Sequence, residues 1–230
     1  MIIFLVFSHD SSSDSRYTDI EYYKTMEQKA VDYYKNSNME YRLIKYNSDI
    51  STLYEEKGDT FYIKGQEAYD VKTCNYKDRI AFNYYKNYKY IYKSTVTSIP
   101  NISFILEIIN LVENNNIDIL YCGPVFIGHG KFFVGGFALL LNNKAIEIIL
   151  NEEWDTNDDE SIGKILQNYM ISYPYWANHN YHQDEYIDIT FTDKFSIKLV
   201  MYKENRLPEH DYRLHDIVTS EFLGLLRSRI

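Results

Sequence analysis

The stretch that decides the fold runs Tyr88-Lys-Tyr-Ile-Tyr-Lys93, then a helical segment at 102–114, then Ile117-Asp-Ile-Leu-Tyr-Cys122. The two outer runs are short and rich in aromatic or β-branched residues, which is typical of strands. The middle segment has helical spacing and stops at Asn114-Asn-Asn116. A strand, a helix and another strand in this order predict an α/β fold with a mainly parallel sheet.

The same alternation continues on both sides of this stretch. It predicts strands at 2–8, 41–46, 59–64, 187–191 and 196–202, helices at 19–36, 72–87, 142–151, 159–171 and 218–228, and a weak helical turn at 50–57. The sequence has no internal repeat and no linker-like tract, and 230 residues are enough for one sizeable core. We therefore expect a single domain over residues 1–230, with a mixed, mainly parallel sheet flanked by helices.

Composition restricts the classes of function. The net charge of −9 argues against a nucleic-acid partner, because that affinity comes mainly from Lys and Arg. Cys74 and Cys122 form no disulfide framework or metal-ligand spacing, so a reducing compartment, the cytoplasm, is the simpler expectation; one bridge between them is the alternative. The apolar start at 1–7 is too short to span a membrane, and we expect no membrane span. The 24 Tyr are compatible with sugar-lining surfaces and equally with AT-rich coding.

Four segments contain the candidate chemistry. They are Tyr90-Ile-Tyr-Lys-Ser-Thr-Val-Thr-Ser-Ile-Pro-Asn101, then Leu120-Tyr-Cys-Gly-Pro-Val-Phe126 with Lys131-Phe-Phe-Val-Gly-Gly-Phe-Ala-Leu-Leu-Leu141, then Asp158-Asp-Glu-Ser-Ile-Gly163, and Arg213-Leu-His-Asp-Ile-Val-Thr-Ser-Glu-Phe-Leu223. In order and spacing they resemble the fringe and β-1,3-galactosyltransferase group, glycosyltransferase family 31. The resemblance covers roughly residues 59–225. It implies a GT-A, Rossmann-like fold and transfer of a sugar, with inversion, from a UDP-sugar to a hydroxyl of a glycan or glycoprotein acceptor.

The most specific motif of that family is changed in this chain. Where the family has three aspartates after its Lys-Thr, this sequence has Thr95, Val96 and Thr97. Carboxylates there normally hold Mn²⁺ or Mg²⁺ against the diphosphate, since hard cations prefer charged oxygen ligands, and threonine hydroxyls are poor substitutes. The resemblance leaves His215 as the one candidate metal ligand. A strand followed by a turn explains the same residues without any site.

The resemblance places Asp159 as the base that deprotonates the acceptor hydroxyl. An aspartate at the start of an amphipathic helix is also an ordinary cap or helix-dipole partner, and both descriptions can hold together. Asp158 and Trp176 are the candidate acceptor-binding residues. The candidate donor-binding residues are Lys93, Thr95, Thr97, Lys131, Gly135, Gly136 and His215.

Two functions follow from these residues. The first is a glycosyltransferase that works without a metal, in which Lys93, Lys131 and His215 stabilise the departing diphosphate. The second is an inactive transferase-like fold that binds a glycan or a protein, which the missing carboxylates favour. Gly135 and Gly136 allow a close backbone approach to a ligand in the first case and form a bulge or tight turn in either.

Overall fold

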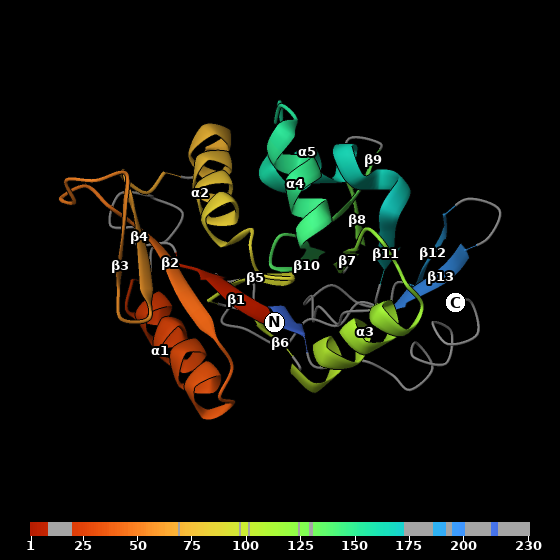
Figure 1. The fold of residues 1–230 in the computed structure, drawn as a ribbon, viewed down its shortest axis with the longest axis horizontal. Coiled ribbons are helices and arrows are strands. Elements are labelled where there is room, and N and C mark those ends of the chain that lie inside the picture. Colours follow the sequence, from red (N-terminus) through yellow and green to blue (C-terminus); the bar gives the residue numbers. More distant parts are fainter. Residues whose placement is uncertain are drawn as a thin grey trace.

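The computed structural model describes residues 1–8, 20–68, 70–96, 98–100, 102–123, 125–128, 131–172, 186–191, 195–200 and 213–215. At its centre, strand β1 (Ile2–Phe7) lies between β2 (Tyr41–Asn47) and β5 (Tyr90–Thr95), and it is parallel to both (Figure 1). The main sheet has eight strands in the order β11-β7-β10-β5-β1-β2-β4-β3. The other five are β3 (Tyr54–Lys57), β4 (Thr60–Lys64), β7 (Tyr121–Gly123), β10 (Ala138–Asn142) and β11 (Met170–Ser172).

Strand directions confirm the predicted fold class. The pairs β1–β2, β1–β5, β2–β4 and β7–β11 are parallel, whereas β10 is antiparallel to β5 and β7, and β3 is antiparallel to β4. The sheet is therefore mixed and mainly parallel. Three two-stranded pairs accompany it: β8 (Val125–Gly128) with β9 (Lys131–Val134), β6 (Ser98–Pro100) with β14 (Arg213–His215), and β12 (Tyr186–Phe191) with β13 (Phe195–Val200).

Helices cover both faces of the main sheet. The helices α1 (Ile20–Asn36) and α3 (Ile102–Asn114) lie on one face, and α2 (Val71–Tyr85), α4 (Asn143–Asn151) and α5 (Asp158–Leu166) lie on the other (Figure 1). Because side chains alternate along a strand, each face has its own core. Phe4 packs against Tyr34 of α1 and against Tyr92, while Leu5 and Leu139 belong to the core beneath α2, α4 and α5.

The chain order creates a switch point between β1 and β5. From β1 the chain passes through α1 to β2 on one side, and from β4 it returns through α2 to β5 on the other side of β1. Since α1 and α2 lie on opposite faces, the connections diverge where the carboxyl ends of β1 and β5 meet. Ligands of open α/β sheets bind outside the strand ends at such points.

Three predicted elements differ from the structure. The turn expected to be helical at 50–57 contains the edge strand β3, which pairs with β4 across a tight turn at Gly58. The strand expected at 117–122 is shorter, since β7 begins at Tyr121. The helix expected to continue to residue 171 ends at Leu166, and Met170–Ser172 pairs with β7 instead. The last helix, expected at 218–228, lies outside the described residues.

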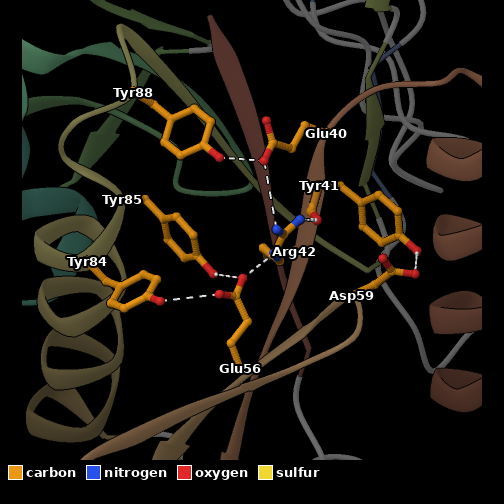
Figure 2. A network of polar contacts seen from close by, with 8 residues as sticks. All are labelled: Glu40, Tyr41, Arg42, Glu56, Asp59, Tyr84, Tyr85 and Tyr88. Carbon is orange, nitrogen blue, oxygen red and sulfur yellow. Dashed lines mark hydrogen bonds and ion pairs between the residues drawn. The ribbon is translucent and has the colours of Figure 1, made fainter.

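A polar network fastens the edge hairpin to the sheet and to α2 (Figure 2). The guanidinium of Arg42 on β2 bonds to Glu56 of β3 and lies 3.8 Å from Glu40. Three tyrosine hydroxyls donate to these carboxylates: Tyr84 and Tyr85 to Glu56, and Tyr88 to Glu40. The network therefore joins β2, β3 and the end of α2 through one cation.

Candidate functional site

The candidate site lies at the carboxyl edge of β1 and β5, on the face covered by α2 and α5. The amide of Val96 donates to the carbonyl of Phe7, which joins the two strand ends. Strand β10 is antiparallel to β5 with Ala138 opposite Ser94, so the Gly135-Gly136 turn that precedes β10 reaches the same edge. The switch point and the glycine turn therefore meet.

Lys93 is the centre of this site. Its ammonium contacts Asp78 Oδ2 and lies 2.5 Å from Asp158 Oδ2 and 4.0 Å from Asp159 Oδ1. It also lies 5.1 Å from the centre of the Phe7 ring. The side chains of Lys93 and Asp78 are 5% and 3% exposed, whereas those of Asp158 and Asp159 are 19% and 27% exposed. Three carboxylates on two helices thus surround one buried ammonium.

The start of α5 places its two aspartates in this position. Asn157 is the N-cap residue, and its carbonyl accepts the first helical hydrogen bond from Ser161 at 2.8 Å. The following turn holds Asp158 and Asp159, where carboxylates interact favourably with the positive end of the helix. Asn75 of α2 donates to the carbonyl of Thr156 at 2.8 Å and so ties α2 to this end of α5. Asp159 is therefore a first-turn residue on a fixed helix start and not its cap.

Gly136 is required by the close approach of this helix. A Cβ at residue 136 would lie 2.1 Å from Asp159 Oδ1 and 2.8 Å from Lys93 Nζ. No side chain fits there unless the carboxylate moves. Asp159 Oδ1 is itself buried and, within the described part of the chain, has no hydrogen-bond partner. The exposed fraction of the Asp159 side chain therefore comes from atoms other than Oδ1.

Burial and mutual repulsion give the three carboxyl groups different pKa values. Desolvation, followed by the charge of Asp158, raises the pKa of Asp159 to about 7. Desolvation also raises the pKa of Asp78 well above its usual range, although Lys93 opposes this. Burial acts in the same direction on Asp158, but Lys93 and hydrogen bonds from Asp78 and Asp159 outweigh it and lower its pKa. Asp159 is thus a carboxyl group whose ionisation changes near neutral pH, as a general base requires.

A second buried ion pair lies at the same edge. The ammonium of Lys77 donates to the carbonyl of Ser8 at 2.6 Å and to both oxygens of Glu67 at 2.9 Å. Sequence reasoning did not select Glu67 or Asp78 as site residues, and it gave Lys77 only as a minor candidate that a solvated charge explains. The polar residues on both sides of Lys77 and Asp78 in α2 give no signal that these two charges are buried.

The remaining predicted residues are placed as follows. Thr95, two residues after Lys93 in β5, donates to the Ser98 hydroxyl at 3.1 Å. Strand β14 pairs with β6 so that His215 is opposite Pro100, which brings the late segment beside the chain that follows Thr95. Lys131 lies in β9 opposite Gly128. Thr97 and Trp176 lie outside the described residues.

The described residues do not suit a divalent cation. Among them no group of three His, Cys, Asp or Glu side chains has the arrangement of a metal site. The carboxylates that converge here already surround the ammonium of Lys93, and the hydroxyl of Thr95 is a neutral ligand. Mn²⁺ and Mg²⁺ therefore have no ligand set in this part of the chain.

Comparison of the sequence with models of protein families and with curated proteins finds no match. In the described part of the chain, no helix is both long enough and apolar enough to cross a lipid bilayer.

Proposed function

We propose that this chain is a GT-A-type glycosyltransferase that moves a sugar from a nucleotide-sugar, UDP-linked, to a glycan hydroxyl with inversion. The observation that carries the proposal is Asp159, a 27%-exposed carboxylate at the β1–β5 switch point, whose pKa is raised to about 7. A base with this proton affinity at the ligand-binding edge of an α/β sheet suits deprotonation of an alcohol.

In this reaction the acceptor hydroxyl transfers its proton to Asp159 as its oxygen attacks the anomeric carbon. The bond between that carbon and the diphosphate oxygen breaks on the opposite face, and its electron pair leaves with the nucleotide diphosphate. Lys93 and Asp158 hold the carboxylate in place, because they fix the start of α5 against β5. Asp158 is accordingly a partner of Lys93 in this proposal as well as a residue beside the acceptor.

The charge of Lys93 is not free for the diphosphate, because Asp78 and Asp158 neutralise it. Lys77 is similarly paired with Glu67. Stabilisation of the leaving group is therefore assigned to Lys131, His215 and the amides of the Gly135-Gly136 turn. This assignment needs no metal ion.

The test is transfer or hydrolysis of UDP-sugars, followed by mass spectrometry, with Asp159→Asn. Asn cannot accept the proton, so we expect loss of most turnover in a folded protein whose thermal unfolding temperature is not lower than that of the parent, and EDTA should have no effect on the parent. The matched control is Asp155→Asn, because Asp155 is half-exposed in the same segment and pairs with Lys164 at the surface. For the parent, kcat/KM should rise with pH through about 7. Equal turnover in parent and Asp159→Asn would refute the assignment.

A binding module for a glycan or a protein is the second candidate. It is favoured by the absence of carboxylates at 95–97 and by the closed charge pairing of Lys93. Calorimetric titration of UDP-sugars with and without Mn²⁺ separates the two functions. Metal-independent donor binding supports the transferase, and no nucleotide binding under either condition supports the module.

A further inference from the structure

Asp78 has no place in the proposed reaction, yet it is the most deeply buried carboxylate of the site. It is 2% exposed in the middle of α2 and directly contacts Lys93. It lies outside the four segments that suggested a transferase, so its position is information that the structure alone supplies.

Charge balance requires at least one carboxyl group of this site to hold a proton. Three carboxylates face one ammonium, and the groups nearest to them add no compensating charge. Cys74 on α2 is a neutral thiol whose pKa burial raises to about 12, and Lys77 is occupied by Glu67. Two uncompensated negative charges in a largely buried site are unfavourable, and proteins avoid this by protonating a carboxyl group.

Geometry indicates which group holds the proton. Asp158 is the common partner, because it accepts from Lys93, which Asp78 also contacts, and because its negative charge raises the pKa of both Asp78 and Asp159. It is therefore the carboxylate that remains ionised. Asp78 is the least exposed of the other two, so water stabilises its charged form least. A protonated Asp78 can then donate a hydrogen bond to Asp158.

We propose that Asp78 is a positioning residue: it stays protonated at neutral pH, donates to Asp158, and through Asp158 holds Asp159 in its poised place. The role of Asp159 as a base rests on the proposed function, but the convergence of Asp78, Asp158 and Asp159 on the ammonium of Lys93 is a property of the fold. Asp78 itself touches no reacting atom. Its hydrogen bond fixes the central carboxylate from the α2 side, while Lys93 fixes it from β5.

The inference predicts different effects of two substitutions of Asp78 on the pH at which Asp159 titrates. Asp78→Asn keeps a neutral group with an N–H donor, so Asp158 keeps its partner. Asp78→Ala removes the donor and leaves a space beside a polar cluster, which water can fill. Water reduces the desolvation that raises the proton affinity of Asp159, so its titration midpoint should fall toward the ordinary aspartate range.

The experiment is a pH titration of the full chain labelled with ¹³C-carboxyl aspartate, followed by NMR. In the parent, the Asp159 signal should titrate near pH 7 and the Asp78 signal should keep the shift of a protonated carboxyl group through neutrality. Asp78→Asn should leave the Asp159 midpoint unchanged, and Asp78→Ala should lower it. Asp158→Asn is the positive control, since it removes the ionised neighbour and must lower the midpoint.

Two outcomes would overturn the inference: an Asp159 midpoint that falls in Asp78→Asn as far as in Asp158→Asn, or one that stays in place in Asp78→Ala. The first would mean that Asp78 is ionised. If Asp78→Ala does not fold, the Asn variant alone decides. The readout is independent of turnover, so a failure of Asp159→Asn to lose activity would refute the proposed function and leave this result standing.

Discussion

Gly136→Ala tests the geometry of the candidate site more directly than removal of any charged residue. The new Cβ would lie 2.1 Å from Asp159 Oδ1, and Cβ contacts below 3.0 Å essentially never occur. The Gly135-Gly136 turn, the start of α5 or the Asp159 carboxylate itself must therefore move by at least 3.0 − 2.1 = 0.9 Å. The φ of Gly136 is not in the left-handed region, so its backbone accepts Ala, and the clash falls on the side chains of Asp159 and Lys93.

Two consequences follow from a displacement of this size. Overpacking of this kind costs about 1–3 kcal/mol, which for a chain of 230 residues corresponds to a fall of about 2–12 °C in Tm. A catalytic group that moves by roughly 1 Å loses activity on the order of 10²-fold. The carboxylate should also move toward water, so the raised pKa of Asp159 should fall from about 7 toward its ordinary value.

The assay combines thermal unfolding, NMR titration of Asp159 and UDP-sugar turnover. The matched control is Gly58→Ala in the β3–β4 turn, where a Cβ meets nothing within 4 Å but φ is +58°. A left-handed residue with a side chain costs about 1–2 kcal/mol, so the control should lower Tm by a similar amount and leave Asp159 unchanged. A Gly136→Ala protein with the parent's Tm and the parent's Asp159 midpoint would refute the described packing.

Two further predictions concern stability. Arg42→Met should lower the free energy of unfolding in urea by about 1–3 kcal/mol, because it leaves Glu40 and Glu56 facing each other without their shared donor. The control Lys57→Met removes an exposed ion pair with Glu55 and should lower the free energy of unfolding by less than about 1 kcal/mol. Equal effects of the two substitutions would contradict the network of Figure 2. Because the pKa of Asp159 is raised from 3.8 to about 7, the folded state binds its proton more tightly than the unfolded state. That contribution is complete below pH 3.8 and is lost as the pH rises through about 7, so Asp159→Asn should flatten the decline in stability across this window; parallel stability curves would show that Asp159 titrates normally.

Sequence reasoning located elements well where the local pattern and the tertiary environment agree. The helix predicted at 102–114 has these bounds in the structure, because its apolar face is continuous and it ends in a run of three asparagines, 114–116. The prediction from the sequence was wrong at 50–57, where weak helical spacing competes with pairing between Tyr54–Lys57 and β4. It was also wrong at 170–172, where apolar residues that continue the helical pattern pair with β7. The pairing of 170–172 with β7 joins segments far apart in the chain and leaves little local trace, whereas β3 and β4 form a hairpin in which residues 57 and 60 are opposite each other.

The same distinction applies to the site. Lys93, Gly136 and Asp159 were chosen from three separate segments, and the structure brings them into contact. Their roles in a reaction remain predictions. Asp78 and Glu67 were missed, because a buried charge has the same local sequence signal as an exposed one, whether it lies in a helix as Asp78 does or just before it as Glu67 does. Only the partner across the fold distinguishes them, and that partner is 15 residues away for Asp78 and Lys93.

The charge arrangement sets a condition on any nucleotide-sugar chemistry at this edge. With Asp78 and Asp159 protonated, Lys93 and Asp158 cancel, and when Asp159 loses its proton the cluster becomes negative. A cluster of this kind can accept a proton but cannot attract a diphosphate. The base and the leaving-group stabiliser must therefore be separate structures. In the proposed transferase, the first is the Asp78–Lys93–Asp158–Asp159 cluster, and the second consists of Lys131 on β9, which pairs with β8, and His215 on β14, which pairs with β6. This separation is what an inverting displacement needs, because the proton and the diphosphate leave from opposite faces of the sugar.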